Sequence, residues 1–165
     1  MNAKDVENLY NQHFEGIYRY FYSWLLHKQE SEELVSDCFL RALNFCESFA
    51  PESVVSKKAW LFKIARNLLV DYFRKKKPIV VDFSEFELPE KSKIEENTDI
   101  EINFKKVLVE ISGLESRQGE IIMMRFQNGL KNKEIAEILK IEEKSVSSSI
   151  AKALKTLRSK LKGKI

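Results

Sequence analysis

The apolar positions in the first half of the chain recur at steps of three and four residues, the spacing of amphipathic α-helices. This period predicts helices over about 6–26, 31–46 and 57–76. Ser31 is the expected N-cap of the second helix, with Glu32 and Glu33 in a first turn where the helix dipole favours acids. The expected inward-facing positions are Leu9, Tyr10, Phe14, Ile17, Tyr18, Phe21, Tyr22 and Leu25 in the first helix, and Leu34, Val35, Cys38, Phe39, Ala42, Leu43 and Cys46 in the second.

The third predicted helix has two different faces. Its polar face carries Lys63, Arg66, Asn67 and Arg74, and the helix runs into three lysines before Pro78 stops it. Its core face would consist of Trp60, Leu61, Ile64, Ala65, Leu68, Leu69 and Tyr72.

Residues 78–102 lose the helical period. They hold two prolines and eight acidic residues, a composition typical of an extended or partly disordered linker. Helical periodicity resumes after residue 103, pauses at the C-cap signal Asn128-Gly129, and continues in two helices at 132–140 and about 142–162. The sequence therefore predicts an all-α protein of two small helical domains, 1–77 and 103–165, joined by the linker 78–102.

The last two helices have the spacing of a helix-turn-helix. Lys140 stands where the turn usually carries glycine, and a non-glycine residue in the left-handed conformation costs about 1 kcal/mol. The expected packing positions are Ile135, Ala136, Leu139, Ile141, Val146 and Ile150. The second helix exposes side chains that can contact phosphates and base edges, namely Lys144, Ser145, Ser147, Ser148, Ser149, Lys152, Lys155 and Arg158. A helical hairpin that only packs is the alternative.

Charge is arranged in blocks along the chain. Residues 51–77 carry eight Lys and Arg against two Asp and Glu, and residues 103–165 carry 14 against seven, with the acidic segment between them. Two basic blocks suggest two contacts with a polyanion such as DNA. Solvated helix faces without a target are the alternative interpretation.

The sequence offers little for catalysis, and we expect no catalytic residue, no metal site and no cofactor. Cys38 and Cys46 lie within one apolar-periodic segment and are expected to be buried hydrophobes without a disulfide. No apolar run of about 18 residues and no signal-peptide pattern is present. We therefore expect a protein that is not an enzyme, does not insert into a membrane and stays in the cytoplasm.

Specific residues carry a resemblance to a known family. In the first half, Leu9-Tyr10, Ile17–Tyr20, Glu32–Leu43 and Ala59–Arg74 resemble, in this order, region two of extracytoplasmic-function (ECF) sigma factors of the sigma-70 family. In the second half, Leu114–Gln118, Met124–Phe126 and Glu134–Glu137 resemble region four of the same family. The ordered pair implies an RNA polymerase sigma factor, which binds the core polymerase and directs promoter-specific initiation while the core performs catalysis.

The resemblance also implies roles for individual residues. The stretch Glu33–Arg41 would bind the clamp helices of the polymerase's largest subunit, through Leu34, Val35, Asp37, Cys38, Phe39 and Arg41, although its apolar residues also suit the core of a helical bundle. The third helix would hold the separated non-template strand of the minus-ten element through Lys57, Lys58, Lys63, Arg66, Asn67 and Arg74. Among these Asn67 is the candidate for reading a base edge, and Trp60 is either a core residue or a stacking platform. The recognition helix would read the minus-35 duplex through Lys144, Ser145, Ser147, Ser148, Lys152 and Lys155.

Further partners follow from the same resemblance. They are the flap of the second polymerase subunit and a possible anti-sigma factor that would cover both helical domains. A free-standing helix-turn-helix regulator is the alternative function. A sigma-like interaction module that occupies the polymerase without supporting transcription is a third.

Overall fold

The computed structural model describes residues 1–50, 56–76, 109–111 and 113–162, and its secondary structure over these residues is helical. The first half contains α1 (Ala3–Leu25), α2 (Lys28–Phe45), the 3-10 turn η1 (Cys46–Ser48) and α3 (Lys57–Lys76). The second half contains α5 (Ser116–Ile122), the π-helical turn η3 (Met123–Gln127), α6 (Asn132–Leu139) and α7 (Glu143–Leu161). The all-α prediction is confirmed, and the third helix has the predicted bounds. The predicted linker 78–102 lies outside the described residues.

The hairpin of α1 and α2 is tighter than the sequence predicted. Leu26 adopts the left-handed conformation (φ 49°) directly after α1, and α2 begins at Lys28 with His27 as its N-cap. The prediction of Ser31 as N-cap is wrong, because the left-handed residue reverses the chain within two positions and starts α2 earlier. Ser31 lies inside the helix, is fully buried, and donates a hydrogen bond from its hydroxyl to the His27 carbonyl over 2.7 Å.

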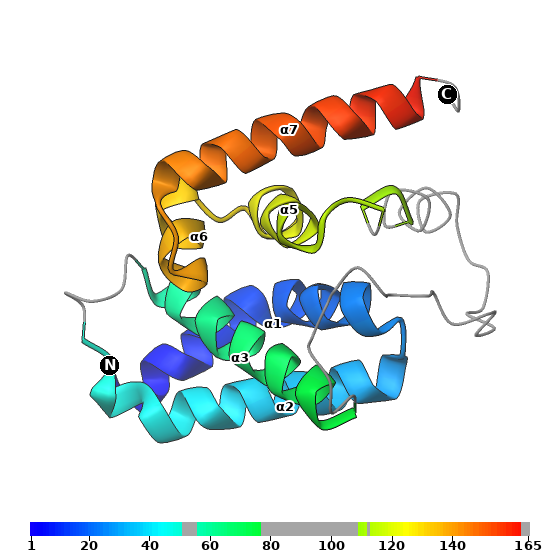
Figure 1. Ribbon diagram of the computed structural model, residues 1–165. Coiled ribbons are helices and arrows are strands. Elements are labelled where there is room, and N and C mark those ends of the chain that lie inside the picture. Colours follow the sequence, from blue (N-terminus) through cyan, green and yellow to red (C-terminus); the bar gives the residue numbers. More distant parts are fainter. Residues whose placement is uncertain (51–55, 77–108, 112, 163–165) are drawn as a thin grey trace.

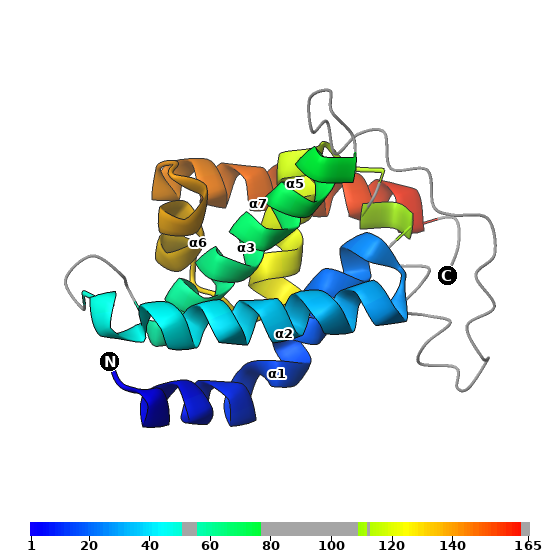
Figure 2. The ribbon, with the colours of Figure 1, turned by 90° about the horizontal axis from the view of Figure 1, so that it is seen from below.

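The helices α1 and α2 lie side by side and α3 crosses them, and both α1 and α3 contact the second half (Figures 1 and 2). The core between them contains most of the predicted positions. Tyr10, Phe14 and Leu43 were predicted to face inward, but they are 45%, 39% and 44% exposed. Tyr20 and Phe62 were not predicted, yet both are almost completely buried and their rings meet edge to face at 5.8 Å.

The second half forms the predicted helix-turn-helix. Ile135, Ala136 and Val146 are buried where α6 and α7 cross. Lys140 ends α6 in the left-handed conformation (φ 53°, ψ 47°), as its position in the turn predicted. Gly129 is also left-handed (φ 64°), which confirms the predicted C-cap. The π turn η3 was not predicted, and within it Phe126 is 60% exposed instead of buried.

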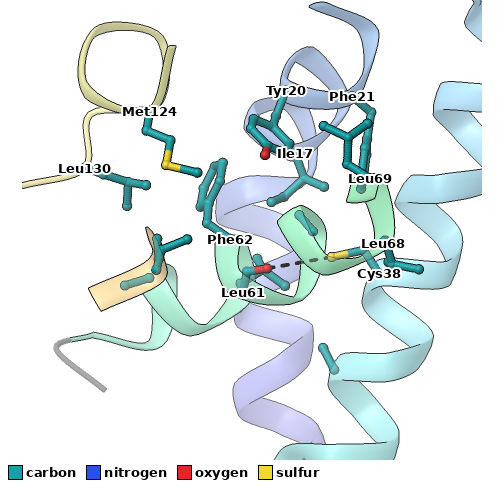
Figure 3. Packing of buried hydrophobic residues seen from close by; sticks show 14 of the residues in the cluster. Ile17, Tyr20, Phe21, Cys38, Leu61, Phe62, Leu68, Leu69, Met124 and Leu130 are labelled. Atoms are coloured by element: carbon teal, nitrogen blue, oxygen red, sulfur yellow. Dashed lines mark hydrogen bonds between the residues drawn. The ribbon is translucent and has the colours of Figure 1, made fainter. Parts of the chain in front are cut away.

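One continuous apolar cluster spans both halves of the protein. Phe62 on α3 and Tyr20 on α1 belong to the same cluster as Met124, Leu130 and residues of α6 (Figure 3). A smaller cluster beneath α7 contains Ile111, Leu114, Ile122, Met123 and Ala153. The second half therefore covers the side of α3 that faces away from α2, and this accounts for the unpredicted burial of Tyr20 and Phe62.

Candidate nucleic-acid interface

The helix α7 presents the side chains expected to contact duplex DNA. Lys144, Ser145, Ser147, Ser148, Lys152 and Lys155 are all exposed, while Ser149 is half-buried. The helix is anchored from its other side by Val146 and Ala153, which are completely buried. Basic and hydroxyl side chains on a braced helix of this kind can neutralise phosphates and contact base edges in a major groove.

Ser147 has less freedom than its neighbours on α7. Its hydroxyl donates to the Glu143 carbonyl over 3.2 Å and accepts a hydrogen bond from the Asn132 side-chain amide over 3.1 Å. A serine hydroxyl has one donor and two acceptor sites. In this arrangement Ser147 retains one acceptor site for a DNA donor, and Asn132 ties the start of α6 to the recognition helix.

A hollow of about 310 Å³ lies between the end of α2 and α3. Trp60, Lys63 and Asn67 line it from α3, together with Phe45, Ser48, Phe49, Ala50 and Ile64. The rings of Phe49 and Trp60 meet nearly perpendicularly at 5.6 Å. Trp60 packs against the core, which is one of the two roles that the sequence suggested, and it also lines the hollow.

The side chains predicted to hold the minus-ten strand lie on different sides of α3 in the tertiary structure. Lys63 and Asn67 lie at the hollow, but Lys58 and Arg66 point toward the second half of the protein. Lys58 donates a hydrogen bond to the Asn128 carbonyl. Arg66 holds the carboxylate of Glu120, with Nε 2.7 Å from Oε1 and Nη2 3.5 Å from Oε2.

The predicted cations at the two ends of α3 have acidic neighbours. Lys57 donates to Asp5 over 2.6 Å and lowers the pKa of this carboxyl, and Arg74 binds Asp71 over 2.9 Å. These pairs lie at the surface, where ion pairs contribute little to stability. Lys57 and Arg74 can therefore exchange their carboxylate partners for phosphates at small cost.

The residues predicted to bind the core polymerase fall into two groups. Leu34, Val35, Cys38 and Phe39 are at most 8% exposed, so their side chains are not available to a partner in this structure. Asp37 and Arg41 are exposed, and Arg41 lies 3.8 Å from Asp71 of α3.

The accessible face of α2 carries apolar residues that sequence reasoning did not assign to a partner. Leu40 and Leu43 are 57% and 44% exposed; Leu40 lies about one helical turn after Asp37, and Leu43 about one turn after Leu40. Leu40 lies outside the core stripe by helical period, and this was the signal available in the sequence. An exposed pair of leucines beside charged residues is typical of a protein-binding surface.

The two cysteines are both free and buried, as predicted. Burial raises the pKa of the Cys38 thiol to about 12, so the thiolate is scarce at neutral pH. Among the described residues, no helix is long and apolar enough to cross a membrane.

Comparison with known families agrees with this arrangement of helices. A model of sigma-70 region 2 matches residues 9–79, and a model of sigma-70 region 4 matches residues 104–157. The chain belongs to the sigma-70 family, and it is an RNA polymerase sigma factor.

Its curated relatives place it in the ECF group of this family. It is 25% identical to the ECF RNA polymerase sigma factor SigX of Bacillus subtilis over 91% of this chain and 80% of the relative. It is 26% identical to the ECF RNA polymerase sigma factor SigM of the same organism over 93% of each chain. Sigma factors are initiation factors without enzymatic activity of their own, and the free-standing regulator is not favoured.

Two solved structures have the same fold. CnrH, in complex with the cytosolic domain of CnrY, superposes with a TM-score of 0.74 at 20% identity and covers 99% of this chain and 92% of its own. The sigma factor RpoE of Bartonella quintana, in complex with the anti-sigma factor NepR, gives a TM-score of 0.73 at 19% identity and covers 99% of this chain and 100% of its own.

Proposed function

We propose that this sigma factor directs initiation through three surfaces: the hollow on α3 for one unpaired base of the minus-ten element, α7 for the minus-35 duplex, and the exposed face of α2 for the polymerase clamp. The single observation that carries the proposal is the hollow. An apolar and aromatic lining, one cation and one amide are the groups that an extruded base and its phosphate require.

Each group in the hollow has a distinct role. Trp60 and Phe49 provide apolar surface for the base, and Lys63 is placed to neutralise an adjacent phosphate. The Asn67 amide has both a donor and an acceptor, so it can read a base edge. The surrounding helices hold these residues before DNA arrives, because Ala65, Leu68 and Leu69 anchor α3 in the core.

The polymerase contact uses the accessible side of α2. Leu40 and Leu43 supply apolar area, while Asp37 and Arg41 supply oriented charge. Leu34, Val35, Cys38 and Phe39 are buried and are not part of the proposed contact, whereas the exposed Asp37 and Arg41 are. The flap of the second subunit is the proposed partner of the second half. An anti-sigma factor is a further proposed partner, because the sigma factor RpoE, which has the same fold, is in complex with the anti-sigma factor NepR.

Run-off transcription tests the proposal. Purified protein is combined with bacterial core polymerase on a pool of genomic promoter fragments, and defined start sites are expected only when the protein is present. A promoter found in this way is then prepared with each of the four bases at successive non-template minus-ten positions. With the wild-type protein, one position should show strong base preference.

Asn67→Ala should abolish the preference at that position while binding of the core polymerase stays unchanged. The matched control is Asn11→Ala, which removes an exposed amide on α1 far along the chain from the hollow. Base preference that survives Asn67→Ala would show that Asn67 does not read the base. An absence of start sites with the wild-type protein would contradict the initiation function itself.

A further inference from the structure

The hydroxyl of Ser147 on the recognition helix α7 has its proton committed within the protein. It donates to the Glu143 carbonyl over 3.2 Å, one helical turn earlier, and it accepts a hydrogen bond from the Asn132 side-chain amide over 3.1 Å. A serine hydroxyl has one proton and two acceptor sites. Because the side chain is exposed, the one site that remains for DNA is an acceptor.

Asn132 holds this arrangement from the start of α6. Its side chain is half-buried, and within the described part of the chain its Oδ1 is buried without a hydrogen-bond partner. The acceptor character of Ser147 does not depend on which end of the amide faces it. If Oδ1 stood in place of Nδ2, it would accept the hydroxyl proton, and Ser147 would again offer only acceptor sites to DNA.

The neighbouring positions on this edge of α7 are consistent with an acceptor surface. Glu143 lies one turn before Ser147, is exposed, and carries a carboxylate, which is also an acceptor. Ala151 lies one turn after Ser147 and has no polar side-chain atom. Lys144, three residues before Ser147, is a donor whose proposed partner is a phosphate. These residues belong to the first turns of α7, which are the part of a recognition helix that contacts base edges.

We propose that Ser147, positioned by Asn132, selects an amine-bearing base, adenine or cytosine, over the keto bases guanine and thymine on the strand that it contacts in the minus-35 duplex. This inference rests on the proposed role of α7 in binding that duplex. In the major groove adenine presents its N6 amine and cytosine its N4 amine, which are donors. Guanine presents O6 and N7, and thymine presents O4, which are all acceptors.

The size of this selection follows from the loss of one hydrogen bond. Opposite a keto base, the Ser147 oxygen meets a second acceptor, and no proton lies between them. To donate its own proton to the base, the hydroxyl would have to give up the Glu143 carbonyl while Asn132 still holds its oxygen. One neutral hydrogen bond contributes modestly to binding, so we expect a preference of about three- to tenfold.

The first measurement is base preference in the minus-35 element, with the protein bound to core polymerase as the holoenzyme. A promoter found by run-off transcription is prepared with each of the four base pairs at every minus-35 position, and equilibrium binding to each duplex is measured. With the wild-type protein, one position should favour adenine and cytosine over guanine and thymine on the same strand by about three- to tenfold.

Ser147→Ala should bring the four bases at that position to within about twofold of one another, because it removes the only hydroxyl that the proposal uses. The matched control is Ser159→Ala, which removes an exposed serine hydroxyl from the same helix, twelve residues further along the chain. This control should keep the wild-type preference at every position.

The second measurement removes a single donor from the DNA. An adenine at the selected position is replaced by purine, which lacks the N6 amine and keeps N7, and a cytosine is replaced by 2-pyrimidinone, which lacks the N4 amine. The wild-type holoenzyme should lose the same three- to tenfold in affinity, whereas Ser147→Ala should bind both duplexes about equally. The weaker pairing of the analogue cancels in this comparison, because both proteins bind the same two duplexes.

Asn132→Ala tests the positioning role of the amide. Without it, the Ser147 hydroxyl is free to turn and donate to a keto oxygen, so the preference at the selected position should fall while binding to the favoured base stays near wild type. A merely structural role of Asn132 in the first turn of α6 would instead weaken binding to all four bases alike. Asn11→Ala, which removes an exposed amide from α1, is the matched control.

The outcomes separate this inference from the proposed function. A wild-type preference for guanine or thymine at the position that Ser147→Ala alters would overturn the acceptor role of Ser147. An equal loss for all four bases in Ser147→Ala, or a loss on amine removal that persists in this variant, would overturn it too. Full preference in Asn132→Ala would overturn the positioning role. In each case the holoenzyme still initiates at the promoter, whereas a wild-type holoenzyme without base preference at any minus-35 position would contradict the proposed role of α7.

Discussion

The left-handed residues at the two turns of the second half allow a pair of reciprocal stability predictions. Lys140 ends α6 at φ 53° and ψ 47°, and its side chain is exposed. Gly129 precedes α6 at φ 64°, and a Cβ built there would meet only the Lys58 ammonium, at 3.6 Å. Both positions therefore isolate the cost of a side chain on a left-handed backbone, without a clash in the surroundings.

Lys140→Gly should stabilise the protein. The substitution removes about 1–2 kcal/mol of left-handed strain and returns about 0.5–1 kcal/mol through the greater freedom of glycine in the unfolded chain. The net gain is about 0.5–1 kcal/mol, which raises the melting temperature by roughly 1–4 °C in a protein of this size. Gly129→Ala should produce a loss of similar size for the same reason.

Thermal and urea unfolding followed by circular dichroism would measure both changes, with Lys140→Ala as the control. That control removes the same side chain but keeps the Cβ, so it should leave stability nearly unchanged. Loss of stability in Lys140→Gly, or a Gly129→Ala variant as stable as wild type, would refute the reasoning. The turn of the helix-turn-helix would then not be fixed in the left-handed conformation.

Three further predictions concern the first half. Leu40→Ala and Leu43→Ala should each weaken binding to core polymerase by about 1 kcal/mol in a pull-down titration. Neither substitution should change the melting temperature, because both side chains are exposed. Unchanged binding would exclude this face of α2 from the polymerase contact. The pKa of Glu30 is lowered by hydrogen bonds from Lys76 and Tyr72, so its stabilising effect should be fully present above the ordinary carboxyl pKa of 4.5 and be lost as the pH falls through the lowered pKa of the folded protein. Glu30→Gln should therefore differ from wild type in urea unfolding more at pH 7 than at pH 3. Cys38 should resist alkylation at pH 8 in the native protein and react after unfolding, because burial raises its pKa to about 12; rapid native labelling at this position would contradict its burial.

The local sequence was sufficient to predict the helices because each carries an apolar stripe at helical spacing. The bounds of α3 followed from its periodicity and from the basic run before Pro78. The left-handed turn at Lys140 followed from the fixed length of a helix-turn-helix. The start of α2 could not be predicted from the sequence. It depends on the left-handed backbone conformation of Leu26, and a leucine gives no signal for a left-handed turn.

The candidate site was only partly predictable. Sequence spacing placed Lys63 and Asn67 on the polar face of α3, and the structure brings both to the hollow beside Trp60. The same spacing placed Arg66 on that face of α3. In the structure Arg66 binds Glu120, because α5 covers one edge of α3. For α2, periodicity identified the buried stripe and thereby pointed to residues that a partner cannot reach.

The sequence by itself therefore determined most of the helices, the order of the two halves and the family, because periodicity and local motifs depend on residues close together in the chain. Tertiary structure alone decided which face of each helix is free. Tyr20 and Phe62 are buried, and Lys58 and Arg66 are paired, through residues more than 50 positions away in the chain. The physical reason is that burial and ion pairing depend on which surfaces meet in space, and the period of a single helix contains no information about its partner.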